Sequence, residues 1–201
     1  MRNPRPPVAT RVPMLASIAV VLALATGACS GDGSKKSASP EPSSSGSTSA
    51  APVPTSATLG KVTGHLARRQ RAPLEKSVTE AVDRWFDNAF VAGNYPRGDF
   101  HDAFAGFTAG AHNEAVRDRR LMSNADIGRR IDAVDVRRRR LHIDVLAVRG
   151  RPVGVTARVA LVFATSGRVH KRLRVQGSLF LTHTHRHWRV FGYDVTKGVA
   201  R

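Results

Sequence analysis

The apolar residues between positions 73 and 93 recur at intervals of three and four, which is the spacing of one face of an α-helix. Pro73 suits the first position of such a helix, and Gly93 suits the left-handed residue that follows its last turn. The pattern therefore predicts a helix over residues 73–93. Its buried stripe comprises Leu74, Val78, Val82, Trp85, Phe86, Ala89 and Phe90.

Shorter helical segments are expected directly after this helix. Asp99 is placed to cap a short helix that ends near Phe104, and Thr108 is placed to cap another that runs to about Met122. From Ile127 onward the period of the apolar positions changes from 3.6 to 2, through 141–147, 153–163, 173–181 and 188–195. Alternating segments joined by short turns predict an antiparallel meander. Residues 131–136 form either an extra strand or the start of a long bent one. Helices followed by such a sheet make the fold class α+β.

The first 28 residues have the layout of a secretory signal peptide. Three arginines precede an uncharged run at 14–28, which is shorter than the roughly 20 residues that a spanning helix needs. Small residues then lead to Cys29, the only cysteine of the chain. A basic start, a short apolar run and a small-residue end predict a cleaved leader and an exported product.

The residues around Cys29 also carry a family resemblance. The segment Ala25-Thr26-Gly27-Ala28-Cys29 resembles the lipobox of bacterial lipoproteins, although Thr26 stands where the family usually has Leu or Val. The resemblance implies that the Cys29 thiol is acylated and that the chain is cut just before it. Membrane localisation through this lipid anchor, on the outer face of the cell membrane, would follow. The alternative is an ordinary signal peptide cut near Ala28, with Cys29 incidental.

Residues 29–60 are rich in Ser, Thr, Pro, Gly and Ala and contain no aromatic residue. Such a composition cannot bury enough apolar surface to offset its ordering entropy, so we expect a disordered tether. Its root-mean-square reach is about 30 Å. Residues 61–201 then form the folded domain, with an ordered core at about 73–197 and enough chain for one hydrophobic core.

The order of elements in this domain resembles NTF2-like (cystatin-like, SnoaL-like) domains. The matching features are the long helix ending at Gly93, the shorter helices after it and the meander. The strand ends Gly150-Arg-Pro-Val-Gly and Trp188-Arg-Val-Phe-Gly-Tyr are similar to those of actinobacterial exported lipoproteins and Mce-associated domains. The resemblance implies a cone in which N-terminal helices pack on a curved antiparallel sheet. No catalytic motif accompanies it.

The chain is strongly basic, with a formal net charge of +17. Arg137, Arg138, Arg139 and Arg140 are consecutive, and more arginines follow in the sheet region. They suit contact with an anionic surface: lipid headgroups, a wall polymer or an acidic protein. They equally suit a solvated strand face or edge, where charge blocks unwanted pairing. Nucleic acid is disfavoured by export and by the lack of RNA-stacking aromatics.

A pocket for an apolar ligand is one interpretation of the aromatic residues, and burial in the core is the other. The candidates for the pocket lining are Trp85, Phe90, Trp188, Phe191 and Tyr193. If Trp85 and Phe90 fill the interior of the cone, the hypothesis of an enzyme with its active site in that cone is excluded.

The candidates for acid–base chemistry are Asp83, Asp99, His101, Asp144 and Tyr193, none with an evident partner. Asp144 is expected to pair with an arginine of a strand. His183, His185 and His187 have the spacing of metal ligands on one strand, but a hairpin turn is expected to separate them. No cofactor and no metal are predicted.

The sequence thus favours an exported lipoprotein whose domain is a non-catalytic interaction or scaffold module of the cell envelope, or binds a small apolar ligand. Its partners would be the membrane and an envelope protein, an anionic lipid or a wall polymer. The alternatives are a pocket enzyme of the isomerase or dehydratase type and an electrostatic docking module. The oligomeric state is not determined by the sequence.

Overall fold

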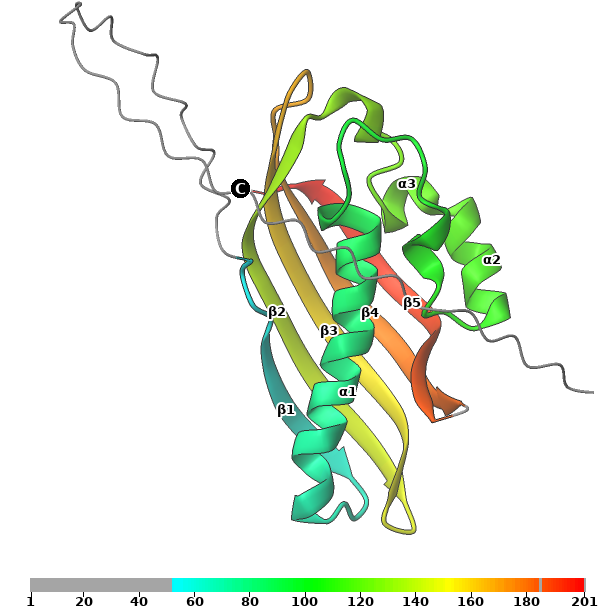
Figure 1. Ribbon diagram of the computed structural model, residues 1–201. Coiled ribbons are helices and arrows are strands. Elements are labelled where there is room, and N and C mark those ends of the chain that lie inside the picture. The colour runs from blue at the N-terminus through cyan, green and yellow to red at the C-terminus, as the bar shows by residue number, and fades with distance from the viewer. Residues whose placement is uncertain (1–51, 185, 201) are drawn as a thin grey trace, which may run out of the picture. The chain divides into compact units, whose positions relative to one another are not determined.

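The computed structural model describes residues 52–184 and 186–200. The predicted signal peptide, Cys29 and most of the tether lie outside these residues. The fold class is α+β, as predicted, with helices gathered on a five-stranded sheet (Figure 1). The elements in chain order are β1 (Ser56–Thr63), α1 (Arg68–Phe86), a π-helical turn (Asp87–Val91), a 3-10 turn (His101–Phe104), α2 (Ala109–Arg117), α3 (Arg119–Met122), a second 3-10 turn (Gly128–Arg130), β2 (Ala133–Val148), β3 (Arg151–Ser166), β4 (Arg172–Thr184) and β5 (His187–Val199).

The strands follow one another across the sheet in the order β1-β2-β3-β4-β5. Strands β2 to β5 pair antiparallel, which confirms the predicted meander. Strand β1 pairs parallel to β2 and corrects the sequence analysis, which placed residues 56–60 in the tether. Its residues are at most half-buried, and its only large apolar side chains, Leu59 and Val62, are three positions apart, so no strong apolar alternation marked it. Pairing with β2 is what makes this segment a strand.

Helix α1 crosses one face of the sheet, and α2 and α3 pack beside it on β5 (Figure 1). The predicted stripe of α1 is buried: Val78, Val82, Phe86 and Phe90 are each 0% exposed. It packs on the inward side chains of the central strands, among them Leu161, Phe163, Val175, Leu179 and Leu181. None of the described helices is long and apolar enough to cross a membrane.

Helix α1 begins five residues before the predicted start, so that Pro73 lies inside it. Residues that precede the predicted apolar stripe stabilise this additional turn. Leu66 is buried in the core, and the backbone N–H of Ala67 donates to Gln70 Oε1 at 3.3 Å. At the other end the helix widens into the π-helical turn, and Gly93 then has the predicted left-handed conformation, with φ of 98°.

The remaining elements refine the prediction. The cap position of the 3-10 turn His101–Phe104 is Phe100 and not Asp99, so that prediction was wrong, although Asp99 Oδ1 accepts the backbone N–H of His101 at 2.9 Å. The helix expected from Thr108 to Met122 is broken at Asp118 into α2 and α3. Residues 133–136 are the start of one long strand, β2, which is bulged between Val136 and Arg138.

Gly177 in β4 has a φ of 145°, a backbone conformation that other residues rarely adopt. A Cβ atom at this position would collide with the carbonyl oxygen of Asp194 and lie 2.8 Å from Val195 Cα. Only glycine permits this close approach of β4 and β5.

Candidate functional site

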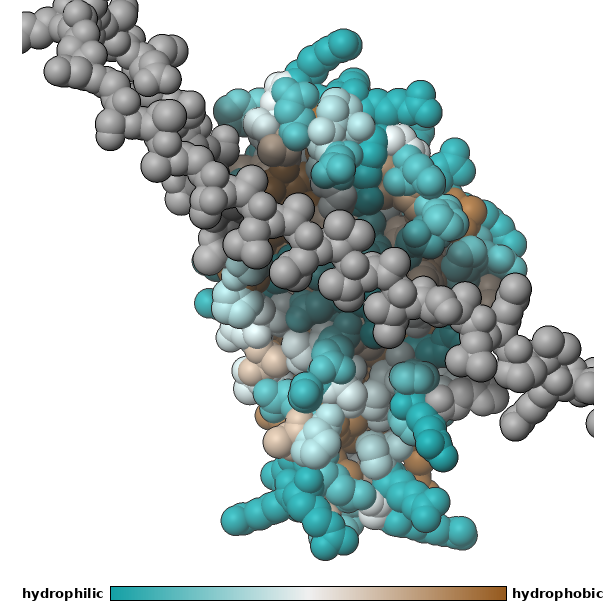
Figure 2. Space-filling view, in the orientation of Figure 1, coloured by the Kyte–Doolittle hydropathy of each residue, from teal (hydrophilic) through white to brown (hydrophobic). Residues whose placement is uncertain are grey.

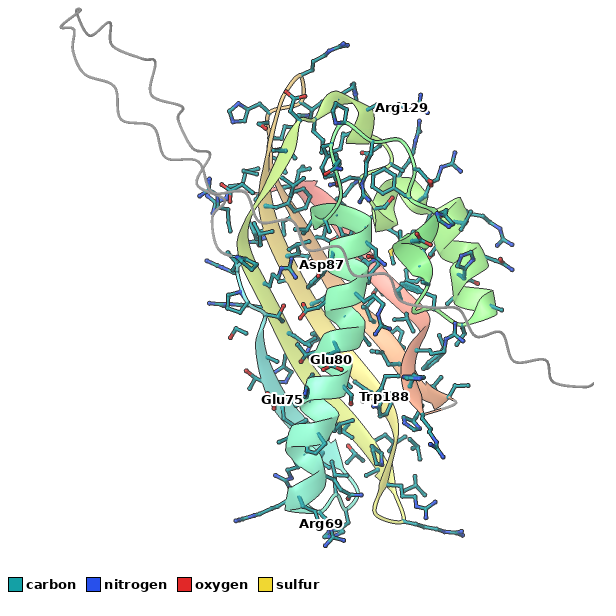
Figure 3. The ribbon with its side chains drawn as sticks, viewed as in Figure 1. Arg69, Glu75, Glu80, Asp87, Arg129 and Trp188 are labelled. Atoms are coloured by element: carbon teal, nitrogen blue, oxygen red, sulfur yellow. The ribbon has the colours of Figure 1, made fainter. Side chains whose placement is uncertain are left out.

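A groove of about 640 Å³ opens at the end of the sheet where α1 begins. Three segments supply its walls: the first turns of α1, the β2–β3 hairpin and the β4–β5 hairpin. Figure 3 shows Arg69 at the start of α1 and Trp188 where β5 begins. The lining residues are Arg69, Gln70, Pro73, Leu74, Ser77, Arg151, Pro152, His183 and Trp188.

The floor of the groove is apolar and belongs to the edge of the core. Leu74 is 4% exposed and Trp188 is 6% exposed. The imidazole of His183 lies across the Trp188 ring in an edge-on arrangement, with 5.3 Å between the ring centres. This contact follows from the register, because His183 pairs directly with Trp188 across the hairpin. Pro73 and Pro152 complete an apolar wall that contributes no backbone N–H at either position.

The rim of the groove is positively charged. Arg69 and Arg151 line it, and Arg68, Arg71, Arg149 and Arg186 stand on the same three segments, all exposed. Residues 64–77, 148–155 and 181–193 contain a single acid, Glu75, which does not line the groove. Within the described part of the chain, none of these six arginines has an ion-pair or hydrogen-bond partner. Figure 2 shows hydrophilic side chains projecting from this lower end, with hydrophobic patches between them.

Two of the predicted pocket residues, Trp85 and Phe90, belong to the core, so that prediction was wrong for them. Trp85 is 3% exposed, and its indole N–H donates to the Met122 carbonyl at 3.1 Å. Its ring meets Phe90 edge-on at 5.4 Å, and Phe90 lies 6.1 Å from Phe163. These rings are part of the hydrophobic core.

The other three predicted pocket residues have different fates. Trp188 lines the groove, as expected. Phe191 follows the inward Val190 in the alternation of β5, so it faces outward, is 53% exposed and lies beside Phe180. There it lines a separate hollow of about 300 Å³ on the opposite face of the sheet. Tyr193 faces inward and donates to Asp118 Oδ2 at 2.8 Å. Burial first, and then the bond to Asp118, raise the pKa of Tyr193 above its ordinary 10.0.

The four consecutive arginines do not form one surface. Arg139 is buried and lies 3.5 Å from Asp83 and 2.5 Å from Asp87, both on the α1 segment. Its prediction as a surface contact was wrong. Arg137 pairs with Asp135 at 2.6 Å, and the β2 bulge leaves it without a partner in the register with β3. Arg138 and Arg140 remain exposed.

The acid–base candidates are engaged elsewhere. Asp144 binds Arg158 at 2.5 Å, which confirms the expected strand partner, and also accepts the backbone N–H of Lys61 at 2.9 Å. His101 lies on the surface, 3.7 Å from Asp99. None of these residues lines the groove.

The turn between β4 and β5 separates the histidines, as predicted, because Thr184 pairs directly with His187. His185 lies outside the described residues. Across residues 52–184 and 186–200 there is no group of three side chains suited to hold a metal ion.

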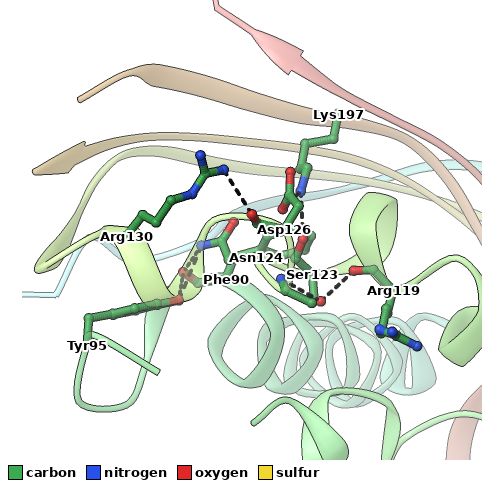
Figure 4. Close-up of polar contacts among 9 residues, drawn as sticks. Phe90, Tyr95, Arg119, Ser123, Asn124, Asp126, Arg130 and Lys197 are labelled. Atoms are coloured by element: carbon green, nitrogen blue, oxygen red, sulfur yellow. Dashed lines mark hydrogen bonds and ion pairs between the residues drawn. The ribbon is translucent and has the colours of Figure 1, made fainter. Parts of the chain in front are cut away.

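A polar cluster below the π-helical turn was missed by the sequence analysis (Figure 4). The Lys197 ammonium donates to the Ser123 carbonyl at 2.7 Å and to Asp126 at 2.6 Å. Asn124 is fully buried, and its side-chain amide donates to the Phe90 carbonyl at 2.9 Å. This bond satisfies a carbonyl group at the end of the π-helical turn. Burial lowers the pKa of Lys197. The one signal in the sequence was a lysine at an inward position of β5, in alternation with Val195.

Comparison of the chain with models of protein families, with curated proteins and with solved structures finds no match. The candidate site therefore stands on its own geometry. An apolar floor under a ring of unpaired cations can bind a molecule that is apolar along most of its length.

Proposed function

We propose that this chain is an exported lipoprotein, anchored to the outer face of the cell membrane through Cys29, whose domain is a non-catalytic binding module. The domain is proposed to be NTF2-like, because its helices precede the antiparallel strands β2 to β5 and α1 packs against the sheet. Its ligand is a small apolar molecule that binds in the groove floored by Leu74 and Trp188.

The groove is the observation that carries this proposal. Its volume lies within the range of about 300–1,000 Å³ that is typical of ligand sites. Near the other end of α1, packed aromatic rings occupy the space between the helices and the sheet. A ligand can therefore bind at the end where α1 begins, against Leu74 and Trp188.

The lining argues for binding rather than catalysis. It contains no carboxylate, and its only histidine, His183, is exposed and rests on Trp188. General acid–base catalysis needs a titratable group held in place and tuned by its surroundings. The groove residues other than His183 supply arginines, a serine, a glutamine and apolar side chains.

Native mass spectrometry of the protein purified from membranes tests the groove. Ser77→Phe should fill it and abolish a bound small molecule, while Trp188 stays in the core. Phe191→Ala, on the opposite face of the sheet, is the matched control and should leave the bound species unchanged. Equal occupancy in both variants, or no bound species in the unsubstituted protein, would contradict the proposal.

The anchor is tested separately by the intact mass of the processed protein. We expect a chain that begins at Cys29 and carries acyl groups, and Cys29→Ser should release it from the membrane fraction. An unmodified thiol on the membrane-bound product would refute the anchor and leave the groove untouched.

A further inference from the structure

The arginines around the groove mouth point to the chemistry of its ligand. The apolar floor alone would accept any apolar chain, but the six arginines of the three surrounding segments add a strong preference of charge. We infer that the groove binds an anionic phospholipid of the membrane, with an acyl chain along Trp188 and the phosphate between Arg69 and Arg151. This inference rests on the proposed function of the groove and names its ligand class.

The two arginines that line the groove are suited to this role. They come from different elements, Arg69 from the first turn of α1 and Arg151 from the first residue of β3. Both therefore stand at ends of the secondary structure, where long side chains can reach a headgroup. A guanidinium can form two parallel hydrogen bonds to phosphate oxygens. Neither guanidinium is paired with another part of the described chain.

The hairpin tips beside the groove combine charge with apolar surface. Val148 and Val153 are 49% and 42% exposed and flank Arg149, Gly150 and Arg151. Arg149 and Arg186 have positive φ values of 50° and 69°, so each sits at the turn of its hairpin. Apolar side chains interspersed with arginines suit the interface between headgroups and acyl chains, where the cations stay hydrated. The same end of the domain can thus meet the membrane and receive a lipid from it.

The opposite end of the sheet supplies a control of equal charge. Arg168 and Arg172 belong to the β3–β4 hairpin, away from the groove lining, and both are exposed. The double variants Arg69→Gln/Arg151→Gln and Arg168→Gln/Arg172→Gln lose the same net charge. They differ only in the end of the molecule from which it is lost.

The experiment uses the fluorescence of the full chain, which has two tryptophans. Trp188 lines the groove and Trp85 lies in the core. Brominated phosphatidylglycerol and phosphatidylcholine with identical acyl chains are titrated into the protein in a nonionic detergent. A bromine in contact with an indole quenches the fluorescence of that indole. A brominated chain in the groove should therefore quench the fluorescence of Trp188, and Trp188→Phe should remove the quenching.

We expect phosphatidylglycerol to quench at a lower concentration than phosphatidylcholine. In Arg69→Gln/Arg151→Gln the half-quenching concentration of phosphatidylglycerol should rise about 30-fold at low salt, since each arginine near an anionic lipid contributes about 1 kcal/mol. The Arg168→Gln/Arg172→Gln variant should retain the preference. Raising the salt should weaken binding of the anionic lipid more than that of the zwitterionic one.

The other outcomes overturn the inference in distinguishable ways. Equal quenching by both lipids would show an occupied groove without a headgroup preference, so the proposed function would stand and the anionic ligand would not. Equal losses in the two double variants would assign the preference to net charge. Displacement of the lipid by inorganic phosphate or by polyphosphate would point to a free anion or a polymer as ligand. No quenching by either lipid would reject the proposed apolar ligand as well.

Discussion

The ion pairs of Arg139 allow a quantitative test of how β2 is tied to α1. The Arg139 side chain is 9% exposed, whereas those of Asp83 and Asp87 are 30% and 41% exposed. The cation is therefore inside the protein, and its two counter-charges reach water. Removing the cation and removing the carboxylates should consequently have different costs.

Asp83→Asn/Asp87→Asn leaves the guanidinium buried without a counter-charge. Breaking a buried ion pair in this way costs about 3–5 kcal/mol of unfolding free energy. In Arg139→Met an apolar chain of similar length fills the space, and the carboxylates regain part of their hydration. We expect that variant to lose about 1–2 kcal/mol, because half-exposed charges are stabilised only weakly by a partner. At about 2–4 °C per kcal/mol for a domain of this size, the carboxylate variant should melt about 10 °C lower and Arg139→Met about 4 °C lower.

Urea unfolding followed by circular dichroism, with thermal melts beside it, measures these differences. Arg138→Met is the matched control, because its side chain is exposed and unpaired within the described residues, and it should change the free energy by less than about 0.5 kcal/mol. The reasoning is refuted if Arg139→Met lowers the free energy of unfolding as much as the double carboxylate variant does. The larger cost could then not be attributed to a buried guanidinium without a counter-charge.

Two further predictions concern β4 and β5. Gly177→Ala should lower the free energy of unfolding by about 3 kcal/mol, because the new Cβ would meet the Asp194 backbone at a φ of 145°. Gly198→Ala is the control, since the space around Gly198 is open, and should lower it by less than about 0.5 kcal/mol. Equal losses in urea unfolding would contradict the close approach of β4 and β5 at Gly177. Because the pKa of Tyr193 is raised, the folded state keeps a proton that the unfolded state releases, so stability should fall as the pH rises past about 10. Tyr193→Phe should flatten that decline in melts compared at each pH; an unchanged slope would refute it.

Local patterns in the sequence determined much of the fold. The stripe from Leu74 to Phe90 is the buried face of α1 and of the π-helical turn after it, and Gly93 follows in the predicted left-handed conformation. The period of two fixed the four antiparallel strands and their turns. These features depend on neighbours within a few residues, which is why the chain alone specifies them. The separation of the histidines by a turn, and the pairing of Asp144 with a strand arginine, followed in the same way.

Contacts between distant segments decided the rest. Strand β1 exists because β2 offers it an edge, and α1 starts early because Leu66 reaches the core. The bulge in β2 shifts the inward positions from Val134 and Val136 to Arg139 and Leu141, and the irregularity in β5 shifts them from Val190 to Tyr193. The groove itself joins three segments far apart in the chain, each unremarkable by itself. Side-chain direction and proximity across a sheet depend on register and curvature, and these are fixed only when the whole sheet has packed on α1.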